Sequence, residues 1–333
     1  IEAQRTILSS MTQYEPQPGD EKKEDKSQNG VVRQVTLLRK GRRIGRIQGP
    51  NRDWLFTDER LDGDPLLEFA TESPSNYTIQ SSDDPKYADA VQPTAVYHKS
   101  VPRDVVLPGG QHPTRHRIYL KLPSNVQPGK TYSIKFTSVV NVKAGELSFN
   151  ADLQNVRSES VHANQIGYRP DDPVKRAFLS IWLGTGGAYA FADGLGFSLI
   201  EEATNKSVFS GKVERVLTID GKEQLWTKPP KNYSSTAVYR MDFSAYNTPG
   251  AYRVYVEGVG CSYPFEIGRP VWEKAFLTQM KGLYNQRSGV ELGPPYTEFK
   301  KPRDFHPDDG AVITRSKYDV LAKGSPYAYA DMM

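Results

Sequence analysis

The sequence predicts a mainly β protein: two tandem β-sandwich domains, the second of them immunoglobulin-like, followed by one helix and an irregular C-terminal segment. Short apolar runs alternate with polar residues along most of the chain, which is typical of strands with one buried face. The 333 residues include 24 Pro and 27 Gly, which form turns, and 19 Tyr and 13 Phe, which favour strands. A 3.6-residue apolar period appears in residues 269–289.

The N-terminal part divides at about residue 30. Residues 1–30 have little apolar content after Met11 and end in QPGDEKKEDKSQNG, a composition that predicts a flexible arm. Residues 31–156 carry short β-type runs such as RHRIYLKL (115–122), separated by turn sequences rich in Pro and Gly. We therefore expect a β-sandwich over residues 31–156, of a family that its sequence does not indicate.

The next region has the strand density of an immunoglobulin-like sandwich. Residues 160–268 contain about seven short strands separated by turn signals. In TAVYRMDFS (236–244), Tyr239 and Met241 alternate with charged residues, so one face of this strand should be buried. The chain has one cysteine, Cys261, so the two-cysteine pattern of antibody domains is absent and the likeness is architectural.

An amphipathic helix of about 17 residues is predicted within residues 269–289. Trp272, Phe276 and Met280 recur at intervals of four, which places them on one side of a helix. Pro270 suits the first helical turn. This apolar side must pack either on the preceding sandwich or against further helices of another domain.

Charge and hydropathy exclude two classes of partner. The chain has 43 Lys and Arg against 39 Asp and Glu, interspersed along the sequence, so no basic stripe for nucleic acid is expected. No apolar run approaches the roughly 20 residues that cross a bilayer. The chain begins at Ile1 without Met, and no signal peptide can be seen, so its start is expected to be removed by processing or to lie outside this sequence.

Histidine and nucleophile motifs give little sign of a catalytic centre. His112 and His116 are four residues apart, but no acidic residue or cysteine lies in register, which favours surface or strand histidines over a zinc pair. GTGG (184–187) follows a predicted strand without a helical pattern after it, so a loop between strands is expected. Cys261 has no neighbouring histidine and is expected to be a buried thiol.

Weak candidates for ligand binding remain. Asp58, Asp62 and Asp64 of DERLDGD could surround a calcium ion, but the downstream bidentate glutamate is missing, which favours an acidic loop. Trp54 and Trp226 are the candidates for stacking on sugar rings. Trp182 lies within the apolar run RAFLSIWL and is expected in the core instead.

Five segments together resemble a known family. VHANQIGYRPDDPVKRAFLSI (161–181) is similar to a V-N-Q-[IV]-G-Y-x-P segment followed by a K-x-A-hydrophobic strand, which opens the N-terminal immunoglobulin-like domain of glycoside hydrolase family 9 cellulases. YRMDFSAYNTPGAYRVYV (239–256) and SYPFEIG (262–268) resemble later strands of that domain. FLTQMKGLYNQRSG (276–289) and FHPDDGA (305–311) resemble the first helix of the catalytic domain and its histidine segment. The resemblance covers about residues 160–311.

The resemblance implies a domain organisation and also shows two departures. Residues 269–333 would begin an α/α toroid, and Trp272, Phe276 and Met280 would pack at its contact with the immunoglobulin-like domain. Many members carry two cysteines that hold a structural zinc with histidines. Ser288 and Phe305 stand at those positions here and only His306 is retained, so no zinc is expected at this site.

The chain by itself is predicted to be inactive. Inverting glycoside hydrolysis needs an acid and a base carboxyl roughly 6.5–9.5 Å apart. The family's catalytic aspartates lie in an Asp-Ala-Gly-Asp segment, which these 333 residues lack. The chain therefore looks like a truncated hydrolase, whose partner is an α/α catalytic domain in the same or another chain.

The implied function is that of an accessory region in a secreted, endoglucanase-type hydrolase of β-glucan or cellulose-like polysaccharide, located outside the cell or in its envelope. In this interpretation the immunoglobulin-like domain stabilises the catalytic toroid. The alternative is a non-catalytic module for carbohydrate binding or cell-surface assembly, derived from such a hydrolase.

Overall fold

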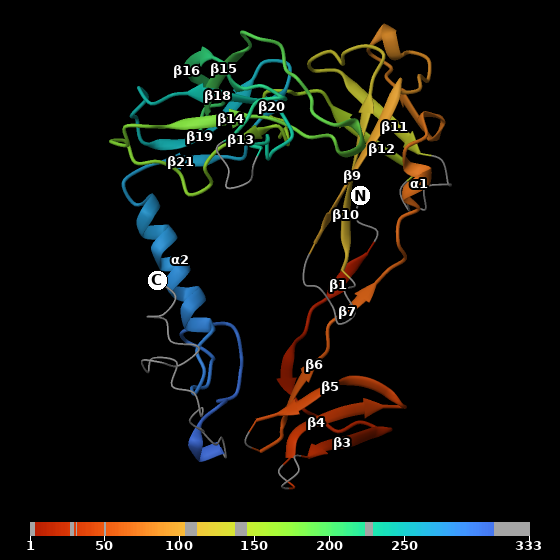
Figure 1. Cartoon of the computed structure of the whole chain (residues 1–333), viewed down its shortest axis with the longest axis vertical. Coiled ribbons are helices and arrows are strands. Elements are labelled where there is room, and N and C mark those ends of the chain that lie inside the picture. Colours follow the sequence, from red (N-terminus) through yellow and green to blue (C-terminus); the bar gives the residue numbers. More distant parts are fainter. Residues whose placement is uncertain are drawn as a thin grey trace. The chain divides into compact units, whose positions relative to one another are not determined.

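The computed structural model describes residues 4–26, 30, 32–49, 51–103, 112–136, 145–223 and 229–309, and the prediction of a mainly β protein is confirmed (Figure 1). The chain forms two compact units. One contains Ile1–Ile7 and Arg60–Thr278, and the other contains Leu8–Glu59 and the chain from Gln279 on. Among the described residues, no helix is long and apolar enough to span a bilayer.

The second unit contains a five-stranded antiparallel sheet with a small core. Its strands, in spatial order, are β2 (Met11–Gln13), β6 (Trp54–Thr57), β5 (Arg42–Gln48), β4 (Val32–Arg39) and β3 (Asp20–Lys26). The buried side chains Val35, Leu37, Ile47 and Leu55 pack together on one face. The even spacing of these residues along each strand gives the sheet a single apolar side.

Strands occur where the sequence predicted a flexible arm. β3 (Asp20–Lys26) is the highly charged stretch DEKKEDK, and it pairs with β4 so that Lys22 lies opposite Leu37. β1 (Arg5–Ile7) pairs with β7 (Arg60–Asp62). A sheet edge needs only backbone donors and acceptors, and charged side chains protect it from further pairing. The highly charged composition of residues 20–26 predicted a flexible segment, although it forms an edge strand.

The first part of the larger unit contains a three-stranded sheet and a two-stranded ribbon. β12 (Glu146–Asn150), β11 (Thr131–Phe136) and β8 (Tyr77–Gln80) form the sheet, and β9 (Ala95–Pro102) pairs with β10 (Thr114–Lys121). Tyr87 and Tyr132 are fully buried and meet edge to face with their ring centroids 5.4 Å apart. A one-turn helix, α1 (Glu68–Thr71), precedes β8, and the short 3-10 helices η1 (Pro74–Asn76) and η2 (Pro85–Tyr87) flank β8.

The remainder of this unit is the predicted immunoglobulin-like sandwich. One sheet has the order β13 (Val161–His162), β14 (Arg176–Leu179), β18 (Val238–Asp242) and β17 (Glu214–Leu217). The other has the order β16 (Lys206–Lys212), β15 (Gly196–Glu201), β19 (Gly250–Val256) and β20 (Gly260–Cys261), with β21 (Phe265–Ile267) also paired to β19. Tyr239 and Met241 of β18 are buried between the sheets, as the alternation predicted.

The predicted helix is α2 (Val271–Asn285), which follows β21 directly. After it, Leu292 and Lys301 form an isolated antiparallel bridge, and the described chain ends at the 3-10 helix η5 (Pro307–Asp309). The helix period in the sequence therefore predicted the correct place, and the helix has 15 residues where about 17 were predicted.

The expectation of a core position for Trp182 is wrong. Its side chain is 44% exposed, and it forms an isolated bridge with Ala188 instead of continuing a strand. The apolar run RAFLSIWL contains a strand only as far as Leu179, because the chain then turns into the 3-10 helix η4 (Gly184–Gly186). An unbroken apolar run hides such a turn, since the alternation that marks a face is missing.

Candidate functional site

The segment that opens the immunoglobulin-like domain, VHANQIGYRPDDP, lies against the strand that leads into α2. The backbone N–H of Tyr168 donates to Glu266 O at 2.9 Å, and Gly268 N–H donates to Tyr168 O at 2.8 Å. Gly167 has a φ of 97°, and a Cβ there would lie 2.3 Å from Glu266 O. Only glycine fits this approach. The segment is therefore a structural joint beside the start of α2.

A buried lysine connects the segments that carry the family resemblance. Lys175 is fully buried, and its ammonium donates to Asp172 O and Asn247 Oδ1, both at 2.9 Å, and to Pro170 O at 3.2 Å. Its backbone N–H donates to Ser244 Oγ at 2.9 Å. Because all three ammonium protons have acceptors, the charge can be buried without a carboxylate partner. Lys175 therefore anchors the turn and is not available for chemistry.

The apolar side of α2 is exposed among the described residues. Trp272, Phe276 and Met280 are 51%, 61% and 46% exposed. Leu283 continues the same side of the helix and is also exposed. The first turn is fixed to the immunoglobulin-like domain by an ion pair between Lys274 and Glu266. A continuous apolar stripe of this kind is a surface that normally lies against another element.

In contrast to the exposed side of α2, the contact between the immunoglobulin-like domain and the β9–β10 ribbon is made by several polar side chains. Lys99 Nζ donates to Glu159 Oε1 at 2.8 Å and to Trp182 O at 2.9 Å, and Tyr119 OH donates to Glu159 Oε2 at 2.8 Å. Arg117 lies 3.1 Å from the same carboxylate. Burial alone would raise the pKa of Glu159, but the bonds from Lys99 and Tyr119 and the charges of Lys99 and Arg117 outweigh it and lower the pKa.

Glycines allow the two partners of this joint to approach closely. A Cβ on Gly184 would lie 2.0 Å from His98 O, and a Cβ on Gly186 would lie 2.5 Å from the Tyr97 ring. His98 N–H donates to Thr185 Oγ1 at 3.0 Å. The sequence predicted a loop at GTGG, whereas Gly184–Gly186 form the short 3-10 helix η4 in the connection between β14 and β15. Its contact with the ribbon could not be predicted from the sequence.

Comparison with known proteins concerns mainly the immunoglobulin-like sandwich. Residues 156–261 match the model of the family described as the cellulase N-terminal Ig-like domain. This region is a cellulase-type immunoglobulin-like domain. Two forms of Endoglucanase D from Acetivibrio thermocellus are 42% identical to the chain over 65 residues, which is 20% of this chain and 10% of theirs.

Solved structures of glycoside hydrolase family 9 proteins are similar to a longer stretch of the chain. A metagenome-derived glycoside hydrolase family 9 endoglucanase is 25% identical, with a TM-score of 0.33, over 44% of this chain and 24% of its own. A Bacteroides ovatus GH9 protein is 21% identical, with a TM-score of 0.33, over 45% of this chain and 23% of its own. The chain thus spans about a tenth of the curated relatives and about a quarter of these structures.

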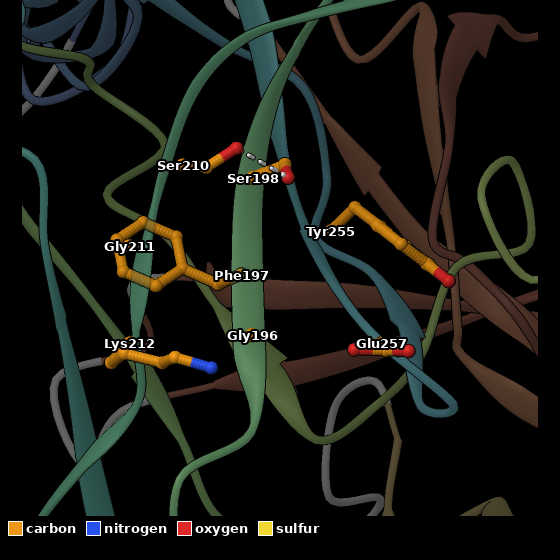
Figure 2. Close-up of a pocket in the computed structure, with 8 residues that line it drawn as sticks. All are labelled: Gly196, Phe197, Ser198, Ser210, Gly211, Lys212, Tyr255 and Glu257. Carbon is orange, nitrogen blue, oxygen red and sulfur yellow. Dashed lines mark hydrogen bonds between the residues drawn. The ribbon is translucent and has the colours of Figure 1, made fainter.

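An open hollow lies on one sheet of the cellulase-type domain (Figure 2). Lys212 and Glu257 lie on either side of β15 in this hollow, and the ring of Phe197 covers Gly211, where a Cβ would lie 2.6 Å from it. Glu257 is the one carboxylate among the lining residues. Glycoside hydrolysis needs two carboxyl groups, so this hollow is not built for that reaction.

The weak ligand candidates from the sequence are scattered or paired with arginines. Asp58 accepts from Arg43 Nε at 2.5 Å, and Asp62 accepts from Arg5 Nε at 2.9 Å. Trp54 is partly buried in β6, and Trp226 lies outside the described residues. The arginines neutralise two of the three predicted carboxylates, and a calcium site that includes Asp64 stays a prediction.

The segments that carry zinc cysteines in many family members lie together here as well. Gly289 N–H donates to Asp304 O at 2.8 Å, which joins the neighbourhoods of Ser288 and Phe305. The Phe305 side chain is exposed, and Nδ1 of His306 lies 3.5 Å from Asp308. A backbone hydrogen bond therefore joins these segments, and neither Ser288 nor Phe305 offers the thiolate that holds the zinc in those members.

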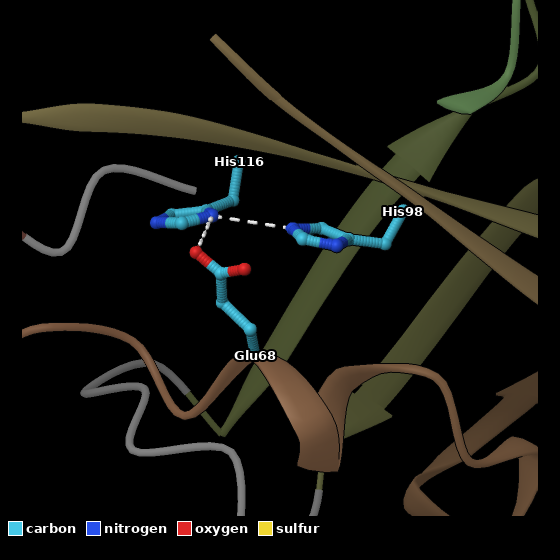
Figure 3. A group of neighbouring side chains, drawn as sticks. All are labelled: Glu68, His98 and His116. Carbon is cyan, nitrogen blue, oxygen red and sulfur yellow. Dashed lines mark hydrogen bonds and ion pairs between the residues drawn. The ribbon is translucent and has the colours of Figure 1, made fainter. Parts of the chain in front are cut away.

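A histidine cluster lies on the other face of the β9–β10 ribbon (Figure 3). His98 Nε2 and His116 Nδ1 are 3.2 Å apart, and Glu68 Oε1 lies 3.6 Å from His116 Nδ1. The sequence suggested His112 as the neighbour of His116 in a possible metal pair, whereas in the structure His116 lies beside His98. Burial lowers the pKa of His116, and the nearby Glu68 charge opposes this effect.

Proposed function

We propose that this chain is the N-terminal accessory region of a secreted, family 9-type glucan hydrolase, in which the cellulase-type immunoglobulin-like domain stabilises an α/α catalytic domain. One observation carries the proposal: a helix with an exposed apolar side follows directly from a domain of the cellulase N-terminal type. Covering that side removes apolar surface from water at about 25 cal/mol per Å². The occupant that fits is the remainder of a helical toroid that begins with α2.

In this proposal the chain alone does not hydrolyse glucan. The sequence has no Asp-Ala-Gly-Asp segment, and the hollow on the immunoglobulin-like domain offers a single carboxylate, Glu257. An inverting mechanism would need a second carboxyl held roughly 6.5–9.5 Å away across the sugar. The catalytic groups would come from the helical domain.

We further propose the domain organisation that supports this role. In it, the β structure within residues 31–156, which the two compact units divide after Glu59, precedes the cellulase-type domain at about 160–268, and residues 269–333 begin the catalytic domain. The substrate would be a β-glucan or cellulose-like polysaccharide outside the cell or at its envelope. The joint at Glu159 would fix the preceding β region to the domain that carries α2.

The deciding experiment is the intact mass of the natural protein together with the coding sequence around Met333. Continuation into a helical domain with an Asp-Ala-Gly-Asp segment is expected. A natural polypeptide that ends at Met333 would overturn the proposal.

Activity assays give a second, independent test. The chain of 333 residues should release no reducing sugar from soluble β-glucan, whereas the natural polypeptide with its helical domain should release it. Retention of the isolated chain on insoluble glucan, with no activity in the longer polypeptide, would instead support a carbohydrate-binding module.

A further inference from the structure

We propose that Glu68, His98 and His116 form a zinc-binding site that ties α1 to the β9–β10 ribbon. Among the described residues, these three are the group whose ligand atoms all lie within 4.8 Å of one another. Two imidazole nitrogens and a carboxylate oxygen form a ligand set that Zn²⁺ accepts. The site is distinct from the accessory role proposed above and does not depend on it.

The strand register brings the two histidines together. Ser100 lies directly opposite His116 in the antiparallel pair, and His98 lies opposite Ile118. Because side chains alternate between faces, His98, Ser100 and His116 share one face, and the two imidazoles are diagonal neighbours. The side chains of His98 and His116 are 9% and 5% exposed, so their ring nitrogens meet away from bulk water.

Two of the three ligand–ligand distances match the edges of a tetrahedron around zinc. Zinc–nitrogen and zinc–oxygen bonds of about 2.0–2.2 Å give ligand–ligand edges of about 3.3–3.6 Å in tetrahedral geometry. The two nitrogens are 3.2 Å apart, and His116 Nδ1 is 3.6 Å from Glu68 Oε1. Figure 3 shows these three atoms turned toward one another. The ligand atoms of His98 and Glu68 lie within 4.8 Å of each other, so this third pair is the one that would adjust to hold the ion.

Ser100 lies within hydrogen-bond distance of both ring nitrogens. Its hydroxyl oxygen lies 2.8 Å from His98 Nε2 and 2.9 Å from His116 Nδ1. In the metal-bound form this oxygen, or a water that it orients, completes four-coordinate geometry. Without the ion, the same hydroxyl can bridge the two rings by hydrogen bonds, so the experiment must measure the metal directly.

The helix supplies an outer partner as well as a ligand. Glu68 begins α1 and Glu72 is its C-cap, four residues later, which places both carboxylates on one side. Glu72 Oε1 lies 3.8 Å from His98 Nδ1, the nitrogen that stays protonated when Nε2 binds a metal. A carboxylate in that place orients a zinc-bound imidazole. Tyr77 OH donates to Thr71 O at 2.7 Å and fixes the turn over the ribbon.

The test is titration of the tag-free chain with Zn²⁺ alone, followed by calorimetry and thermal unfolding. We expect one equivalent to bind at this site and to raise the unfolding temperature, because a ligand that binds only the folded state stabilises it. Co²⁺ in place of Zn²⁺ should give the visible absorption bands of a tetrahedral ion. Failure to bind Zn²⁺ would overturn the proposal.

Variants identify the ligands. His98→Ala should abolish this binding event, and Glu68→Gln should weaken it by more than about 10-fold, the least that loss of an outer-shell partner costs. Glu68 is exposed, so its variant should fold even if His98→Ala does not. His162→Gln alters an exposed histidine of β13 and serves as the control. Equal zinc affinity in Glu68→Gln and in the control would contradict the site.

Discussion

The cellulase-type domain presents two joints of opposite character. At the β9–β10 ribbon, glycines allow close approach and Glu159 is held by Lys99 and Tyr119. At α2, the first turn is fixed by one ion pair, and the apolar side of the helix is exposed. The first joint is complete among the described residues, whereas the second offers a surface still to be covered. We therefore expect the contacts at the ribbon to stabilise the isolated chain, and the apolar side of α2 to contribute to stability only in a longer polypeptide.

The largest effect is expected for Gly184→Ala, which breaks the completed joint. A Cβ there would lie 2.0 Å from His98 O, and φ is 70°, so overlap and backbone strain add up to about 3 kcal/mol of lost unfolding free energy. Urea unfolding measures the loss. Gly194→Ala is the control, because Gly194 has a φ of 77° with open space around its Cβ position. Equal losses in both variants would show that the close approach has no role.

Lys175→Met should cost about 2 kcal/mol, because buried carbonyl groups at the opening turn lose a charged donor. Thermal unfolding of the chain measures the change. Lys212→Met removes an exposed lysine in the same domain and should alter stability by less than about 0.5 kcal/mol. A stable Lys175→Met variant would contradict the anchoring role.

Glu159→Gln tests the charge at the ribbon joint and should cost about 1–2 kcal/mol at neutral pH. The pKa of Glu159 is lowered in the folded state, so its charge stabilises the fold above the ordinary carboxyl pKa of 4.5. This contribution is lost as the pH falls through the lowered folded value. Urea unfolding at a series of pH values should show the variant and the unaltered chain converging in acid.

The smallest effect in the isolated chain is expected for Phe276→Ser on α2. The side chain is 61% exposed, so the unfolding free energy should change by less than about 0.5 kcal/mol. In a polypeptide that includes the catalytic domain, the same change should shorten the thermal inactivation half-life of glucanase activity. Glu273→Gln on the same helix is the control. No difference between the two variants in the longer protein would argue against packing at this face.

Local patterns predicted several elements well. The helix α2 and the alternation of Tyr239 and Met241 follow from periods of 3.6 and 2 residues, which one segment displays without its neighbours. The NQIGY segment indicated the start of the cellulase-type domain through its family resemblance. In the structure, Gly167 and Tyr168 of this segment contact the backbone of Glu266. The helical period, the strand alternation and this motif each lie within a short segment, so they can be recognised in the sequence.

Other features arise only when distant segments meet. Trp182 lies in an apolar run but is exposed beside Lys99, 83 residues away in the chain. His98 and His116 are 18 residues apart, and Glu68 comes from a separate turn. No local sequence pattern predicts that these side chains meet, since their contacts depend on strand register and on the placement of α1.

The sequence by itself determined the β class, the immunoglobulin-like domain, the helix after it and the absence of an Asp-Ala-Gly-Asp segment. These properties depend on residue type and short-range period. Only the tertiary structure decided that GTGG fits against Tyr97, that Glu159 lies among cations and that Glu68 faces two histidines. Side-chain alternation fixes which face a residue occupies, but pairing register and packing decide which residues from elsewhere it meets.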